Sequence, residues 1–192
     1  VSHGLGGTKV RARITLSFRP RVSTGDFLET FSAFLTPWVP MIFTAVPDLS
    51  YRSGAGFPNG VVPGFLESMR IGLLRIDNDL THYGDAVLLY LKRLLGLTIE
   101  FGKVRHWIAR HAVEQIFSEL QRHLVRLPST TGSGPSDPHV RDPVGQAVKQ
   151  RITLAELREL VEVIIANLNG LPREELYRAT PLQKMTREFA GS

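Results

Sequence analysis

Near the middle of the chain, the hydrophobic pattern predicts a strand, a helix and a second strand in succession. The apolar run Ile71–Ile76 ends at a carboxylate, Asp77, and is typical of a buried strand. Residues 85–95 repeat apolar side chains at helical spacing, and Gly96 follows at a position where helix ends favour glycine. Residues 97–101 alternate apolar and polar side chains, which indicates a half-buried strand.

A long amphipathic helix is predicted next, over Trp107–Leu127. Its apolar stripe comprises Val113, Ile116, Phe117, Leu120, Leu124 and Leu127. Glu114 lies off that stripe, with 36 residues between it and Asp77. A strand-end Asp and a helical Glu can meet only if the helix packs across the carboxyl end of the strand. Open α/β sheets place their sites at that end.

Further strands are expected on both sides of these elements. They are predicted at Arg11–Phe18, Met41–Val46 and Arg52–Phe57, where apolar residues alternate with polar ones or form short runs. The pattern of Asp26–Leu35 fits either a strand or a helix, because its Phe and Leu residues also form a helical stripe. The expected core is therefore a mixture of strands and helices.

The chain divides into three parts by composition. Residues 1–127 form the predicted α/β core, and 128–150 form a connector rich in Pro, Gly, Ser and Asp. Residues 151–192 are expected to be a helical extension of the core. Its main helix opens at a capping box, Thr153-Leu154-Ala155-Glu156, and ends at Asn169-Gly170.

Four short motifs follow one another along the chain. They are Asp48-Leu49-Ser50-Tyr51-Arg52 with Gly56; Asp77-Asn78; Ala112–Leu120 around Glu114; and a tail from Leu127–Thr131 through Ile152–Leu154 and Asn169 to Thr180-Pro181. In this order they resemble the catalytic core of retroviral-type integrases and DDE transposases. The tail is similar to that of bacterial transposases of the TnsB and Mu type. The resemblance covers roughly residues 36–185.

The chain departs from the family pattern at several positions. Asp79 stands where the family has Gly after Asp-Asn, and Gln115 stands where it has Arg after Glu. Only 28 residues separate Asp48 from Asp77, which leaves little room for the first helix of the family. Residues 63–70 are the best candidate for that helix.

The first acid of the family pattern can be assigned in two ways. It belongs on the first strand, but the expected first strand, 11–18, carries no carboxylate. Asp26 lies 51 positions before Asp77, the separation usual in the family. Asp48 matches a second-strand motif that does not bind metal in the family, and beside Pro47 it also suits a turn. We take Asp26 as the third acid and keep Asp48 as the alternative.

The resemblance implies a ribonuclease H-like α/β fold, with a mixed five-stranded sheet flanked by helices. It also implies that Asp26, Asp77 and Glu114 bind Mg²⁺ or Mn²⁺, with two ions once DNA is bound. Two such ions about 3.5–4 Å apart clamp the attacking and leaving oxygens of a phosphoryl displacement. The expected function is metal-dependent cleavage and strand transfer of DNA.

The charge of the chain supports a polyanionic partner. The formal net charge is +5 and the pI is about 9.9. Lys103, Arg105, Arg110 and Arg122 lie on or beside the long helix and are the expected contacts to DNA phosphates. The resemblance leaves a second copy of the chain and a partner ATPase open as further partners. With no cysteine and no apolar run near the ~20 residues of a membrane span, a cytoplasmic, nucleoid-associated protein is expected.

Two other functions stay open from the sequence. A non-catalytic DNA-binding or assembly module would use the same fold with a broken site, and a nuclease would cut without joining ends. Other chemistries fit less well. His106 and His111 are five positions apart, which does not suit a metal pair on one helix face, and the Gly54–Gly56 stretch lacks a P-loop lysine.

Overall fold

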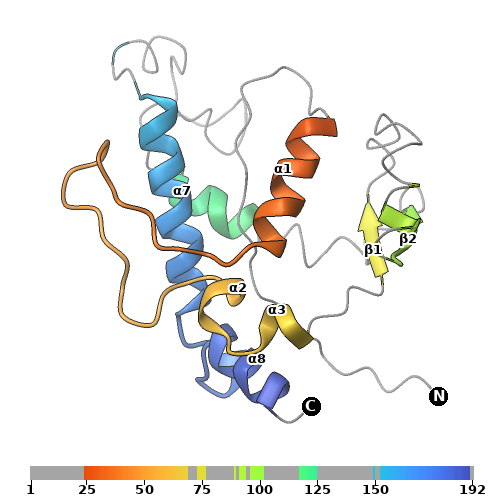
Figure 1. The fold of residues 1–192 in the computed structure, drawn as a ribbon. Helices are drawn as coiled ribbons and strands as arrows, with labels where there is room; N and C mark the ends of the chain where they lie inside the picture. Colours follow the sequence, from red (N-terminus) through yellow and green to blue (C-terminus); the bar gives the residue numbers. More distant parts are fainter. Residues whose placement is uncertain are drawn as a thin grey trace.

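The described part of the chain is mainly helical (Figure 1). The computed structural model describes residues 24–68, 73–76, 89, 91–93, 96–101, 117–124, 149 and 152–190. The elements are α1 (Thr24–Leu35), α2 (Pro58–Val61), α3 (Phe65–Ser68), β1 (Leu73–Ile76), β2 (Thr98–Phe101), α7 (Leu154–Asn169), the 3-10 helix η2 (Glu174–Leu176) and α8 (Pro181–Ala190). A further helical stretch covers 117–124. Within these ranges no helix has both the length and the apolar character to cross a membrane.

The expected five-stranded sheet is wrong for this part of the chain. The strands among the described residues are β1 and β2, which pair in parallel from Leu73 opposite Thr98 to Ile76 opposite Phe101. The segment 41–46, expected to be a buried strand, has no regular structure, and 52–57 forms a turn and irregular chain. The expected strand 11–18 lies outside the described residues.

Hydrogen bonding to α7 explains why two expected strands did not form. The N–H groups at the end of segment 41–46 donate to the side chain of Glu159 on α7, so a neighbouring strand cannot accept from them. In segment 52–57 the N–H of Gly56 donates to the carbonyl of Ala166 at 3.1 Å. The apolar composition of segment 41–46 predicted a buried strand, but Ile42 is 85% exposed.

The strand–helix–strand prediction for the middle of the chain is confirmed where it can be checked. β1 and β2 fall on the two apolar runs, and residues 91–93 between them are helical. Gly96 has φ +64°, the left-handed conformation that a helix C-terminus favours. Leu91 and Leu97 are both buried, and the N–H of Leu97 donates to the carbonyl of Leu91 at 3.5 Å.

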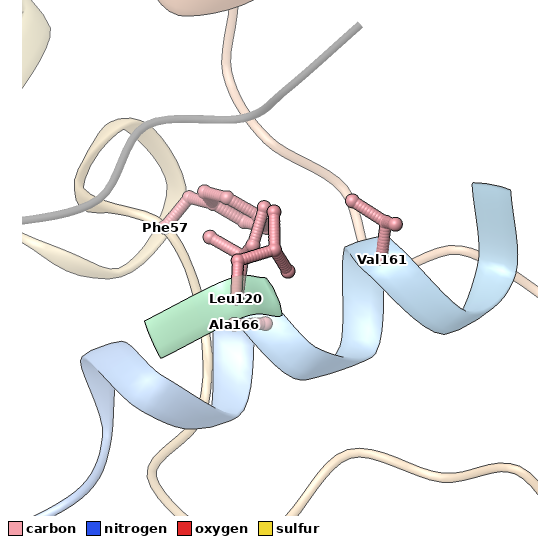
Figure 2. Packing of buried hydrophobic residues seen from close by; sticks show 5 residues of the cluster. Phe57, Leu120, Val161 and Ala166 are labelled. Atoms are coloured by element: carbon pink, nitrogen blue, oxygen red, sulfur yellow. The ribbon is translucent and has the colours of Figure 1, made fainter. Parts of the chain in front are cut away.

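Helix α7 is the central element of the larger cluster, and it begins and ends where the sequence predicts. The Thr153 hydroxyl accepts from the N–H of Glu156, and the Glu156 carboxylate accepts in return from the N–H of Thr153. The buried cluster comprises Phe57, Leu120, Val161, Ile165 and Ala166, as Figure 2 shows. Leu120 comes from the expected long helix, but Phe117, expected on the same stripe, is 56% exposed.

A second apolar cluster joins the two ends of the described chain. Val62, Phe65 and Leu182 are buried in it, and Phe34, Leu66, Met185 and Phe189 pack against them. The ring of Phe65 lies 5.9 Å from that of Phe34 on α1 and 5.3 Å from that of Phe189 on α8. Helices α1 and α8 are therefore held together through α3.

The segment 26–35, left open between strand and helix, is helix α1. Its final carbonyl groups, which have no partner within a helix, accept from another part of the chain. The Asn59 side-chain amide donates to the carbonyls of Ala33 and Thr36. This contact fixes the end of α1 against α2 and directs the chain into segment 37–57.

Candidate metal and DNA site

The two candidate first acids lie in different local structures. Asp26 is half-buried in the first turn of α1, and its backbone carbonyl accepts from the Thr30 hydroxyl at 2.8 Å. An acid in this turn is favoured by the helix dipole. Asp48 is exposed and has φ +55°, a turn conformation that Asp tolerates better than most residues. The turn interpretation of Asp48 is therefore confirmed, and Asp26 lies on a helix, not on the strand of the family pattern.

The remaining expected acids and most of the expected basic contacts lie outside the described residues. These are Asp77, Glu114, Lys103, Arg105 and Arg110.

Their surroundings are partly described. Ile76, the last residue of β1, directly precedes Asp77 in the chain, and it pairs with Phe101 at the end of β2. Parallel strands bring their carboxyl ends to one edge. Arg122 is exposed on the 117–124 helix, and its Nε donates to the Ser118 carbonyl at 3.5 Å.

In the described part of the chain, no group of three or more His, Asp or Glu side chains is placed to hold a metal ion. One acidic side chain there forms an ion pair that joins two segments of the chain. Glu119 pairs with Arg173 at 2.9 Å, which ties the 117–124 helix to the segment before η2.

A polar contact that the sequence did not predict lies between Glu159 and the segment before Asp48. The carboxylate of Glu159 accepts from the backbone N–H groups of Thr44, Ala45 and Val46, at 2.7, 2.9 and 2.9 Å. Ala45 also reaches the second oxygen at 3.1 Å. Because both oxygens are occupied by N–H donors, this carboxylate holds the backbone and is poorly suited to bind a metal or to act as a base.

Further polar groups of α7 hold the rest of segment 37–57. The indole N–H of Trp38 donates to Glu162 at 2.7 Å, and the N–H of Arg52 donates to the side chain of Asn167 at 2.9 Å. The buried amide of Asn169 donates to the carbonyl of Gly56 at 3.0 Å. The side chains of Glu159, Glu162 and Asn169 make contacts on one side of the helix, and we call this side the α7 polar face.

Hydrogen bonding sets the charge state of Glu159. The N–H of Thr44 contributes most to lowering its pKa, burial opposes this, and the N–H groups of Ala45 and Val46 lower it further. Glu159 is only 5% exposed, so an ionised carboxylate here requires these donors.

The sequence did carry a signal for the α7 polar face. Two Glu residues and one Asn recur at helical spacing in a helix whose opposite side is already apolar. Exposed acids on a helix are common, so this pattern is equally typical of a solvated face. Only the packing of segment 37–57 shows that these residues are buried.

No family model, no curated protein and no solved structure matches this chain. Its function is therefore inferred from its own residues and contacts.

Proposed function

We propose that the chain is a metal-dependent polynucleotidyl transferase of the transposase and integrase class, acting on DNA. One observation carries the proposal: Asp77 directly follows β1, and β1 pairs in parallel with β2. Asp77 is the next residue in the chain after Ile76, and the carboxyl ends of parallel strands are where α/β proteins place their sites. The order of the acidic motifs in the sequence supports the same function.

The proposed site has three acids, Asp77, Glu114 and Asp26. Carboxylate oxygens are the ligands that Mg²⁺ and Mn²⁺ prefer, so the donor set fits these ions. When bound, two ions would stabilise the charge that develops on the attacking and leaving oxygens of a phosphodiester. The protein's part is to hold its three carboxylates together and to orient the DNA.

The proposed DNA contacts are basic side chains of the segment 103–122. Lys103, Arg105, Arg110 and Arg122 would bind backbone phosphates and position the scissile linkage without reading sequence. The exposure of Arg122 and the net charge of +5 support this role.

A second candidate is a DNA-binding or assembly module of the same class that lacks catalysis. One observation favours it: Asp26 lies in a helix, whereas the family pattern places the first acid on a strand. Without a third carboxylate near Asp77 and Glu114, two ions would be held poorly, while contacts to DNA phosphates would be unaffected.

Strand transfer and nicking of labelled oligonucleotide duplexes, with Mg²⁺ or Mn²⁺, test the proposal. We expect activity in the chain and its loss in Glu114→Gln and in Asp77→Asn, with the fold and DNA affinity retained. Glu29→Gln is the matched control, because Glu29 is exposed on α1. If Glu114→Gln kept its activity, Glu114 would not be a catalytic residue and the proposed site would be wrong.

The first acid is tested with Asp26→Asn and Asp48→Asn. If Asp26 completes the site, Asp26→Asn alone abolishes activity and also the rise in melting temperature that Mn²⁺ produces in the chain. DNA binding by the unsubstituted chain without activity or Mn²⁺ stabilisation would favour the second candidate.

A further inference from the structure

Segment 37–43 exposes apolar side chains on one side while its other side is anchored. Val39 is 76% exposed and Ile42 is 85% exposed, and Pro37 and Pro40 are also exposed. Trp38, Met41 and Phe43 are half-buried. Figure 1 shows the chain leaving α1, crossing α7 and continuing as a long irregular segment towards α2.

The anchored side is held by specific contacts. The Trp38 ring packs against Tyr51 and Phe57, with ring centres 5.5 and 5.4 Å away, and its indole N–H donates to Glu162. Just beyond the segment, the Glu159 carboxylate holds the N–H groups of residues 44–46. The segment is therefore fixed at both ends, while the side chains of Val39 and Ile42 stay largely exposed.

The backbone of the segment is restricted by its own sequence. Proline fixes φ near −65°, and the residue before a proline is kept out of the helical region. Pro37 and Pro40, three positions apart, therefore favour an extended chain through Val39. Proline also lacks an N–H, which disfavours an added β-strand as the partner along this edge.

The sequence around the segment favours a protein over nucleic acid as its partner. Between Arg21 and Arg52 the chain has no Lys, Arg or His, but it has Asp26, Glu29 and Asp48. This distribution contrasts with the net charge of +5 for the whole chain. An apolar segment with no basic residue near it in the chain offers no cation to phosphates, and it suits a protein partner with an uncharged or basic rim.

We propose that Pro37, Val39, Pro40 and Ile42 form a preorganised docking segment for a partner protein that presents an aromatic-lined groove. Grooves of this kind read an extended Pro-x-x-Pro segment, which has little conformational freedom to lose on binding. Preorganisation by Trp38 and Glu159 reduces that loss further. This interaction goes beyond the proposed DNA chemistry and does not depend on it.

Binding of the full chain to purified SH3-type and WW-type domains, used as probes of this groove chemistry, tests the proposal. We expect at least one probe to bind. Val39→Ser/Ile42→Ser and, separately, Pro37→Ala/Pro40→Ala should each weaken its binding at least tenfold, without changing the circular dichroism. The first variant should keep the melting temperature, and the second should lower it slightly because the unfolded chain gains freedom. Tyr177→Ser is the matched control, because Tyr177 is 97% exposed outside the segment and its loss should leave binding unchanged.

The contribution of preorganisation to binding can be measured with an isolated peptide. A synthetic peptide of residues 36–43 should bind the same probe more weakly than the full chain does. Equal binding by the peptide would show that the contacts of Trp38 and Glu159 do not contribute to binding.

Three results would overturn the proposal. These are no probe binding tighter than about 1 mM, binding that survives both double variants, or displacement of the probe by DNA. A dimer of the chain that is lost in Val39→Ser/Ile42→Ser would instead identify a second copy as the occupant. Each result is independent of the nicking assay, so failure of one proposal leaves the other standing.

Discussion

Three consecutive backbone N–H groups, at residues 44–46, converge on the carboxylate of Glu159. Buried N–H groups that lack an acceptor are costly, and an irregular segment cannot satisfy them by forming a ladder. One ionised side chain supplies the acceptors that a neighbouring strand would otherwise provide. This explains how segment 41–46 can lie against α7 without regular structure.

The lowered pKa of Glu159 predicts acid sensitivity. In the unfolded chain the carboxyl returns to its ordinary value of 4.5, so the unfolded state binds the proton more tightly. The stability contributed by ionisation is present above that value and is lost as pH falls through the lower folded pKa. Urea unfolding between pH 7 and pH 2 should show this loss.

The variant Glu159→Gln isolates the contribution of Glu159. It should lower the urea midpoint at pH 7, because an amide has only one acceptor oxygen for the three N–H groups. It should also reduce the loss of unfolding free energy between pH 7 and pH 2. The part due to Glu156 should remain, because the pKa of that carboxyl is lowered mainly by the backbone of Thr153. Glu29→Gln, at an exposed position, should change neither quantity. If Glu159→Gln lost as much stability on acidification as the unsubstituted chain, the lowered pKa of Glu159 would be contradicted.

At the scale of the element, α7 is buried on two sides for different reasons. Its apolar side meets Phe57 and Leu120, and the α7 polar face holds segment 37–57 through side-chain hydrogen bonds. At its end, a side chain on Gly170 would collide with the backbone of Gly54, so the two segments approach as closely as glycine allows. Helix α7 therefore holds the irregular segment 37–57 in place through its side chains.

The capping box of α7 makes a prediction for the element. Thr153→Ala removes the hydroxyl that accepts from the N–H of Glu156 and should cost about 1 kcal/mol of unfolding free energy. Urea unfolding at pH 7 measures this change. Ser50→Ala, at an exposed loop position, should stay within about 0.5 kcal/mol. Equal effects of the two substitutions would contradict the importance of the cap.

At the scale of the whole molecule, two clusters connect segments that are distant in sequence. One joins residues 57, 120 and 161–166, and the other joins residues 34, 65 and 182–189. The last forty or so residues, taken as an extension from the sequence, supply side chains to both clusters. They belong to the same packed unit as α1 to α3.

Two isoleucines provide a matched test of this packing. Ile165 is 1% exposed and Ile42 is 85% exposed. Ile165→Ala should cost about 2–5 kcal/mol of unfolding free energy, because it removes buried surface and leaves a cavity. Ile42→Ala should change it by less than about 0.5 kcal/mol. Chemical denaturation of both variants gives the comparison, and similar costs would contradict the described core.

DNA binding by the whole molecule should weaken steeply with salt. Four or five phosphate contacts predict a slope of about −4 in a plot of log affinity against log salt concentration. Arg122→Ala should make that slope shallower by about 1. Arg158→Ala, at an exposed position on α7, is the control and should leave it unchanged. A flat response to salt in the unsubstituted chain would indicate that the positive charge serves another purpose.

Local elements of this chain follow the sequence pattern, whereas its long-range pairing does not. The strands after Gly72 and Leu97, the left-handed conformation of Gly96 and both ends of α7 follow the sequence pattern, because each depends on residues near it in the chain. The predicted strands at 41–46 and 52–57 were wrong, and so was the five-stranded sheet, because an apolar run does not specify which partner satisfies its backbone. Of the candidate site, the turn at Asp48 was predicted correctly, and the roles of Asp77 and Glu114 stay predictions.

The sequence by itself determined the local elements, since helix caps, glycine positions and side-chain periodicity act over a few residues. It also determined the net positive charge, on which the proposed DNA contacts depend. Only the tertiary structure decided that acids of α7 are buried, that they hold segment 37–57, and that Val39 and Ile42 face outward. The physical reason is that a hydrogen-bond acceptor more than a hundred residues away can take the place of a neighbouring strand. A local sequence pattern does not indicate which distant residue supplies that acceptor.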